Sequence, residues 1–293
     1  MASAVVLLHG WPGLPSDYDG VREALGDVRV VVPDLLGFGH GYDGPFAEGD
    51  ATADAHARRV LAQLDDDGVR AGAVIGGYDI GSRIAQAALR LDPLRFSGAV
   101  LTPGYPGIGD RAGAPELAAT FWYQHFLRDP IATRLIDGNR DAVHDYLGHI
   151  WEIWSSPGSL SVAPNERRLV DAYARPGAFA ASVQWYRANR GYAGDYAAIQ
   201  TPTTMLWPTA DPLFPLEWAD RVGEYFTNAT VLPVEGVGHF VPIEASREFA
   251  NAIREFACDE MRRAPQPRKH RPRGHEKSGR SQVERPPSAE RPR

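Results

Sequence analysis

A short apolar run, a glycine-flanked turn and a helical pattern surround one aspartate, Asp79. The sequence there is AGAVIG, then Gly77-Tyr78-Asp79-Ile80-Gly81, then SRIAQAALRL. A strand, a tight turn and a helix of this kind lift the central side chain out of the top of a parallel sheet. A carboxylate is a weak nucleophile toward esters, but it suits attack on an sp³ carbon with a strained or good leaving group, which gives an ester intermediate. The alternative is that Asp79 only caps the next helix.

Two later motifs supply an acid and a histidine. Asp211 lies in LWPTADP and His239 in GVGHF, each directly after an apolar strand-like run. The carboxyl ends of parallel strands meet at one edge of a sheet, where ligand chemistry gathers. Each residue alone has an ordinary structural explanation, but the order nucleophile, acid, histidine is that of α/β-hydrolases. The three residues together therefore predict a catalytic triad.

A glycine-rich turn follows the first apolar run, with the sequence His9-Gly10-Trp11-Pro12-Gly13. The backbone N–H groups of Trp11 and Ile80 are the candidate pair of donors to an oxyanion. One such donor contributes about 2.7–4 kcal/mol in comparable sites. The alternative is a plain turn between strand and helix. We interpret His9 itself as structural.

Strand-like apolar runs alternate with helical patterns along most of the chain, which predicts a mostly parallel sheet flanked by helices on both faces. From about residue 102 to 200 the pattern is helical and rich in aromatic residues, as in FWYQHF and VQWYRANRGY, and contains no convincing strand. The sequence predicts an α/β core at 1–103 and 198–260 and an inserted helical cap at 104–197. The expected strands are Ala4–Leu8, Val28–Pro33, Gly72–Gly77, Ser97–Leu101, Thr203–Trp207 and Ala229–Val234, and the expected helices Pro15–Leu25, Ala51–Leu64, Ser82–Arg90, Leu216–Tyr225 and Ile243–Ala257.

Charge is divided unevenly along the 293 residues, whose formal net charge is −6. From Arg262 to the end there are 11 Lys and Arg against 3 Asp and Glu, so this end carries +8 and the rest −14. An acidic body does not suit nucleic acid. The proline-rich basic end, residues 261–293, is expected to be a disordered, solvated tail.

Composition excludes several other classes of protein. The single cysteine, Cys258, permits no intrachain disulfide and no cysteine-based zinc cluster. No apolar run reaches the roughly 18 residues of a membrane span. The first residues, MASAVVLLHG, read as a strand and not as a signal peptide. We therefore expect a cytoplasmic protein, not bound to membranes, that is a monomer or homodimer.

The motifs HGWPG, GYDIG, TADPLFP and GVGHF resemble those of the α/β-hydrolase-fold epoxide hydrolases and the related aspartate-nucleophile dehalogenases, over about residues 4–258. The resemblance implies that two cap tyrosines hydrogen-bond the epoxide oxygen. They correspond to Tyr123 in WYQ and Tyr186 in WYR. A phenol suits this role because it can protonate an alkoxide yet stays protonated at neutral pH. Residues expected to contact substrate beside them are Trp122, Trp185 and His125.

The chain departs from this pattern in two places. These enzymes usually carry about two more strands before the HG motif, which begins here at residue 9. The sheet is therefore expected to lack those strands, or the start of the chain to be set too late. Ile80 also follows the aspartate where many relatives have tryptophan.

These observations predict an epoxide hydrolase that acts on a small-molecule epoxide through an aspartyl ester, without a metal or organic cofactor. One alternative is a haloacid or haloalkane dehalogenase with the same aspartate. The dehalogenases expect N–H donors for the halide that Ile80 lacks, or a His-Trp pair that FWYQHF lacks. The other alternative is a catalytically inactive binding protein on this fold.

Overall fold

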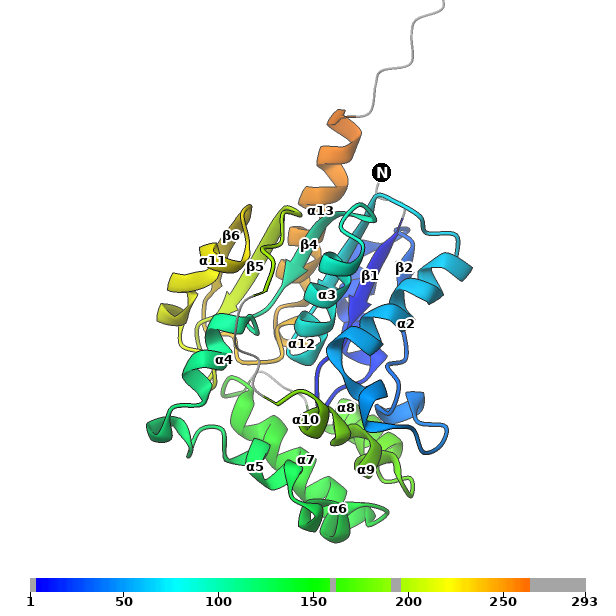
Figure 1. Ribbon diagram of the computed structural model, residues 1–293, viewed down its shortest axis with the longest axis vertical. Helices are drawn as coiled ribbons and strands as arrows, with labels where there is room; N and C mark the ends of the chain where they lie inside the picture. The colour runs from blue at the N-terminus through cyan, green and yellow to red at the C-terminus, as the bar shows by residue number, and fades with distance from the viewer. Residues whose placement is uncertain (1–3, 159–161, 191–195, 264–293) are drawn as a thin grey trace, which may run out of the picture. The chain divides into compact units, whose positions relative to one another are not determined.

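One sheet of six parallel strands organises the molecule, in the order β2-β1-β3-β4-β5-β6 (Figure 1). The computed structural model describes residues 4–158, 162–190 and 196–263. β1 and β3 at the centre are buried along their whole length. The strands are β1 Val5–Leu8, β2 Val30–Val31, β3 Ala73–Gly77, β4 Phe96–Leu101, β5 Thr203–Pro208 and β6 Ala229–Val234.

Helices cover both faces of this sheet, as the alternation of apolar runs and helical patterns predicts. α2 (Ala53–Asp66) and α3 (Ile80–Leu91) lie on one face. The other face carries α1 (Asp19–Leu25), α12 (Val241–Glu244) and α13 (Ser246–Arg263), the last seen in orange behind the sheet in Figure 1. The predicted α/β fold is confirmed.

Two expected elements are shorter or less regular in the structure. Only Val30 and Val31 of the expected strand Val28–Pro33 pair with β1, and both are half-buried. Within the described residues β2 is an edge strand, where a following proline without an N–H ends regular pairing. The segments expected to begin helices at Pro15 and Leu216 are 3₁₀ helices, Pro15–Tyr18 and Leu216–Arg221.

In the described part of the chain, seven α-helices lie between β4 and β5, and most of them gather beyond one end of the sheet (Figure 1). The described residues from 102 to 198 contain no strand. Residues 159–161 and 191–195 of the expected cap lie outside the described part. These helices are α4 Pro106–Ala112, α5 Trp122–Arg128, α6 Pro130–Ile136, α7 Arg140–Trp154, α8 Val162–Tyr173, α9 Ala178–Ser182 and α10 Gln184–Ala188.

The carboxyl end of the chain follows α13. This helix continues to Arg263, so residues 261–263, expected in the tail, are helical. The rest of the expected basic tail, from residue 264, lies outside the described residues.

α3 and β1 cross very closely at Gly81, the second residue of α3. A Cβ atom built there would lie 2.1 Å from the carbonyl oxygen of Leu8. A Cβ on Gly77, at the end of β3, would lie 2.5 Å from the carbonyl oxygen of Gly81. Both obstacles are backbone atoms, which cannot move aside as a side chain can. Glycine at these two positions therefore permits α3 to begin directly above the sheet.

Gly81→Ala should destabilise the fold by about 3 kcal/mol, the upper end of typical overpacking costs, because its methyl group would have to displace β1 or α3. Gly223→Ala is the matched control. Gly223 lies in helix α11 (Val222–Tyr225), is exposed, and has no atom within 4 Å of a built Cβ. It should be neutral or stabilise by up to about 1 kcal/mol. Urea unfolding of both variants measures this, and equal stabilities would contradict the close crossing.

Candidate active site

Asp79 occupies a strained turn at the junction of β3 and α3. Its backbone has φ 51° and ψ −124°, and among the described residues it is the one non-glycine residue with positive φ. Such a conformation costs about 1–3 kcal/mol and persists only where the surroundings impose it. The turn presents the Asp79 side chain above the sheet, with 12 % of it exposed. This is the elbow that the glycine-flanked motif predicts.

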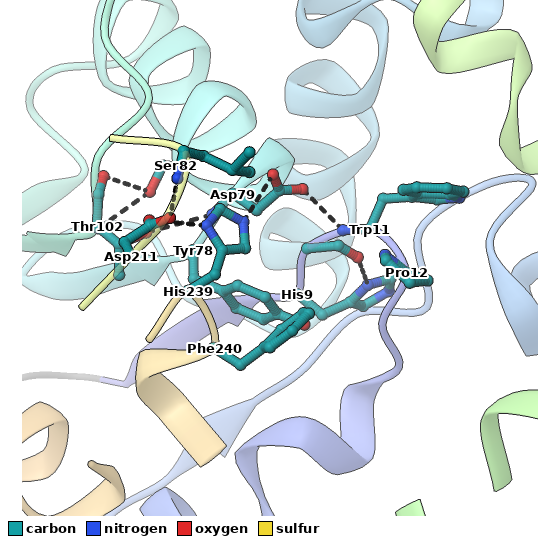
Figure 2. A network of polar contacts seen from close by, with 12 residues as sticks. His9, Trp11, Pro12, Tyr78, Asp79, Ser82, Thr102, Asp211, His239 and Phe240 are labelled. Carbon is teal, nitrogen blue, oxygen red and sulfur yellow. Dashed lines mark hydrogen bonds and ion pairs between the residues drawn. The ribbon is translucent and has the colours of Figure 1, made fainter. Parts of the chain in front are cut away.

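Ser82 and Thr102 hydrogen-bond to this turn (Figure 2). The Ser82 hydroxyl donates to the carbonyl oxygens of Gly77, at 2.8 Å, and Thr102, at 3.0 Å. The Asp79 amide lies 3.3 Å from Thr102 Oγ1, to which it donates. Ser82 is fully buried in these bonds, so it is a structural residue and not a nucleophile. No signal in the sequence indicates the role of Thr102, because threonine is common directly after a strand.

His239 lies between two carboxylates, as Figure 2 shows. Its Nε2 is 3.2 Å from Asp79 Oδ2, and its Nδ1 is 2.9 Å from Asp211 Oδ2. Asp211 Oδ1 in turn accepts the Leu213 amide at 2.8 Å. The side chains of His239 and Asp211 are almost fully buried, so packing holds both in place. The structure thus brings the three predicted triad residues together.

The two carboxylates control the charge of His239. Burial alone would lower the pKa of this imidazole, but Asp211 foremost and then Asp79 outweigh burial and raise the pKa to about 10. An imidazolium between two carboxylates is therefore the resting state near neutral pH. Removing the charge of Asp79 would remove part of what keeps this proton on His239.

The Trp11 amide is the first of the two predicted oxyanion donors. It donates to Asp79 Oδ1 at 2.8 Å, so one carboxylate oxygen is held by the backbone and the other faces His239. Ile80 begins α3 and lines the same cavity. Among the described residues, no hydrogen bond joins the Ile80 amide to Asp79 Oδ1. The role of Ile80 as the second oxyanion donor therefore stays a prediction.

A cavity of about 400 Å³ opens above Asp79, between the sheet and the cap helices. Tyr123 of α5 and Tyr186 of α10 line it, with ring centres 5.9 Å apart and edge-to-face. Burial, and then the charge of Asp79 for Tyr123 and of neighbouring groups for Tyr186, raise the pKa of both phenols. Both are therefore proton donors at neutral pH, facing the same space as the carboxylate.

The three residues expected to contact substrate have different surroundings. Trp185 and His125 line the cavity. Trp122 is not among the lining residues: it is 38 % exposed and packs against Phe126 and Tyr146. The prediction for Trp122 is therefore corrected. Neighbouring residues on a helix point about 100° apart, so Trp122 faces away where Tyr123 faces in.

A buried carboxyl, Asp17, contacts Tyr78, the residue before Asp79, and was not foreseen from the sequence. Its Oδ2 accepts the Tyr78 hydroxyl at 2.5 Å and the Leu14 amide at 2.8 Å. Burial raises the pKa of Asp17 to about 7 despite both bonds. Because Tyr78 precedes Asp79, this pair joins the turn of Asp79 to the loop that carries Trp11. An aspartate beside a proline-initiated turn carries no signal of such a contact.

In residues 4–158, 162–190 and 196–263 there is no group of three or more His, Cys, Asp or Glu side chains placed to hold a metal ion. In the same ranges no helix has the length and apolar character needed to cross a membrane.

A strained turn bearing an aspartate between strand and helix, a histidine between two acids, and helices over a parallel sheet are features of an α/β-hydrolase. The profile of the alpha/beta hydrolase family matches residues 5–252, and the chain belongs to this family. It is 24 % identical over 254 residues to Lipase 3 of Moraxella sp. (strain TA144), covering 86 % of this chain and 76 % of that protein.

Solved structures share the fold. The epoxide hydrolase CorEH matches with a TM-score of 0.76 and 21 % identity, over 88 % of this chain and 92 % of that one. The epoxide hydrolase of Bacillus megaterium, solved with an inhibitor, matches with a TM-score of 0.74 and 15 % identity, over 88 % and 94 %. At these identities the likeness supports the fold and leaves the reaction to be argued from the site.

Asp17→Asn should change how stability depends on pH. Because the folded-state pKa of Asp17, about 7, lies above the ordinary value of 3.8, the folded state binds this proton more tightly than the unfolded state. The stabilisation of the fold by this bound proton is complete below about pH 4. It is lost as the pH rises to about 7, at up to about 1.4 kcal/mol per pH unit. An asparagine oxygen can still accept both bonds but does not titrate.

Urea unfolding at several pH values between 4 and 8 tests this expectation. The Asp17→Asn variant should gain stability relative to wild type as the pH rises from 4 to 7 and hold that difference above 7. If the two stability curves run parallel over this range, Asp17 titrates normally in the fold and the inference is wrong.

Proposed function

We propose that the chain is an epoxide hydrolase that converts an epoxide to a vicinal diol through an ester of Asp79. One observation carries the proposal. The carboxylate of Asp79, held by a backbone amide, faces the phenols of Tyr123 and Tyr186 across a single cavity. A nucleophile for carbon and donors for the departing oxygen are the two groups that opening of an epoxide needs.

In the first step, Asp79 Oδ2 attacks a ring carbon from the side opposite the epoxide oxygen. Oδ1 stays on the Trp11 amide, 2.8 Å away, which fixes the carboxylate plane. The C–O bond of the ring breaks, and Tyr123 and Tyr186 donate to the oxygen, which takes a proton. The product is a hydroxyalkyl ester of Asp79.

The second step depends on the loss of charge in the first. Esterified Asp79 is neutral, so the pKa of His239 falls from its raised value and the imidazole can release its proton. That proton balances the one given to the epoxide oxygen. Neutral His239, still oriented by Asp211 at 2.9 Å, then removes a proton from water, which attacks the ester carbonyl. The oxyanion forms on Oδ1, on the Trp11 amide. When it collapses, the bond between the Asp79 carbonyl carbon and the substrate oxygen breaks, and that oxygen takes the proton that His239 removed from water. The acid left at Asp79 gives its proton to His239, and the diol leaves.

Hydrolysis of carboxylic esters fits this site less well, although the matched relative is named a lipase. Attack of a carboxylate on an ester would form an anhydride, a high-energy intermediate, instead of a stable ester. Ser82, the nearest serine to the turn, is buried in structural hydrogen bonds. The site therefore favours attack on sp³ carbon.

A dehalogenase would use the same carboxylate, and the leaving group separates the two reactions. A halide leaves without a proton and is held by N–H donors, whereas an epoxide oxygen leaves as a strong base. Ile80 offers no side-chain donor beside Asp79, and the phenols of Tyr123 and Tyr186 suit an oxygen leaving group. The proposal accordingly favours the epoxide.

His239→Gln should stall the reaction at the ester, because no base remains to activate water. With styrene oxide as substrate, intact-protein mass spectrometry should find the enzyme increased by the mass of one substrate, and peptide mapping should place it on Asp79. Asp79→Asn should form no adduct and, unless it deamidates, no diol. An Asp79→Asn protein that stays amidated and turns over normally would contradict the mechanism.

Tyr186→Phe should lower diol formation by at least about tenfold. A general acid typically contributes about 10²–10⁴-fold, and Tyr123 remains as a second donor in this variant. The measurement compares wild type and variant on styrene oxide and an aliphatic epoxide, beside chloroacetate and fluoroacetate. Release of halide with no diol would move the chain to the dehalogenases. No product and no adduct from any substrate, with the fold intact, would favour the inactive binding protein.

A further inference from the structure

Gln124 and Arg128 lie one helical turn apart on α5, and both line the cavity above Asp79. Arg128 Nη2 donates to Gln124 Oε1 at 3.0 Å. A guanidinium has donors and no acceptor, so only the oxygen of the Gln124 amide can face it. This contact removes the usual ambiguity in the orientation of an amide group.

The opposite end of the same amide faces Tyr123. Gln124 Nε2 donates to Tyr123 Oη at 3.3 Å. The Tyr123 oxygen is thus an acceptor in this contact, and its own proton is not used there. Burial, the largest effect, raises the pKa of Tyr123, whereas the bond from Gln124 lowers it. The proton of Tyr123 is consequently directed to the remaining side of its oxygen.

Arg128 also contacts the segment of the second tyrosine. Its Nε donates to the carbonyl oxygen of Tyr186 at 3.1 Å, which ties α10 to α5. Burial, and then the nearby Arg190, lower the pKa of Arg128, whereas the phenols of Tyr123 and Tyr186 raise it when they are ionised. Arg128 is therefore placed to favour negative charge on either phenol. One cation spans both tyrosine-bearing helices.

We propose that Gln124 and Arg128 are positioning residues for epoxide opening: Gln124 orients the proton of Tyr123 into the cavity, and Arg128 fixes Gln124 and the Tyr186 segment. This inference rests on the proposed epoxide hydrolase activity. On this proposal both residues act through the tyrosines, and neither forms a bond to the reacting carbon.

The contact between Gln124 and Tyr123 would assist the proton transfer of the first step. When the ring C–O bond breaks, the Tyr123 Oη–H bond breaks and the proton goes to the epoxide oxygen. The Gln124 Nε2–H group is then a donor to a phenolate, a contact that strengthens as charge develops. The proton that His239 releases before the second step restores the phenol. Nothing in the second step, attack of water on the ester, uses Gln124.

The test measures the two half-reactions separately, with styrene oxide in single-turnover experiments. Gln124→Met keeps the length of the side chain but removes both polar atoms. It should slow formation of the Asp79 ester by about tenfold, as for a hydrogen bond that strengthens in the transition state, and change ester hydrolysis by less than about twofold. Arg128→Lys should slow ester formation by a smaller factor, because lysine keeps the positive charge but lacks the planar set of N–H donors of the guanidinium.

Gln124→Glu adds a readout that a packing role would not produce. Its carboxylate still accepts from Arg128, so the shape of the contact is preserved. It cannot donate to Tyr123 Oη, and instead it accepts the proton that should face the epoxide. Ester formation should therefore fall further than in Gln124→Met. If Gln124→Glu forms the ester as fast as Gln124→Met or faster, the proposal is overturned.

A double-mutant cycle identifies Tyr123 as the group through which Gln124 acts. In a Tyr123→Phe background, Gln124→Met should have almost no further effect on ester formation, since the oxygen it orients is gone. An undiminished tenfold effect in that background would mean a structural role. Trp122→Phe is the control: this neighbour on α5 lies outside the cavity, and it should leave both half-reactions unchanged.

The wild-type protein separates failure of this inference from failure of the proposed function. If wild type forms the ester and the diol but Gln124→Met matches it in both steps, only the positioning role is wrong. If wild type forms neither product, the proposed function is wrong and the inference falls with it.

Discussion

The close contact of α3 with the end of β1 is the constraint on which the rest of the site depends. Gly81 rests on the carbonyl oxygen of Leu8, and the turn that allows this approach holds Asp79, two residues earlier, at positive φ. The same approach brings Asp79 within reach of the Trp11 amide in the loop after β1. Backbone packing thus aligns the Asp79 carboxylate with the Trp11 amide, the two groups proposed as nucleophile and oxyanion donor.

Charge then divides the site into a lower and an upper half. Below, His239 sits between Asp79 and Asp211, and two negative charges hold one proton on the imidazole. Above, burial raises the pKa of the phenols of Tyr123 and Tyr186, so both stay protonated. On the proposed mechanism, formation of an ester at Asp79 removes one of these negative charges and changes the lower half from net negative to neutral. His239 could then act as a base only after the first step has occurred.

Local sequence predicted the parts of the structure that follow from periodicity and from fixed motifs. The buried strands, the turn at Asp79 and the placement of Asp211 and His239 near it are of this kind, because strand order and strand ends confine them. The inward face of a cap helix is different. Trp122 and Tyr123 are adjacent in an aromatic segment, and only the packing of α5 decides which of them faces the cavity.

Contacts between distant segments were likewise hidden from the sequence. Thr102 and Asp17 meet the turn of Asp79 from other elements, and neither stands in a recognisable motif. Arg128 lies four residues after Gln124, a common spacing on helices, so its link to Tyr186 is visible only in three dimensions. Such residues act through partners that the fold supplies.

Three side chains of the cap region are anchored on the loop that carries Trp11. The Trp151 indole donates to the Pro12 carbonyl, the Tyr173 hydroxyl donates to the Gly13 carbonyl, and Ser182 accepts the Trp11 indole. These three bonds join the cap helices to the loop that follows β1. Replacing the cap with that of a related enzyme, to obtain a new pocket, would remove these three hydrogen bonds. The natural unit for such a graft is the cap together with its matching HGWPG loop.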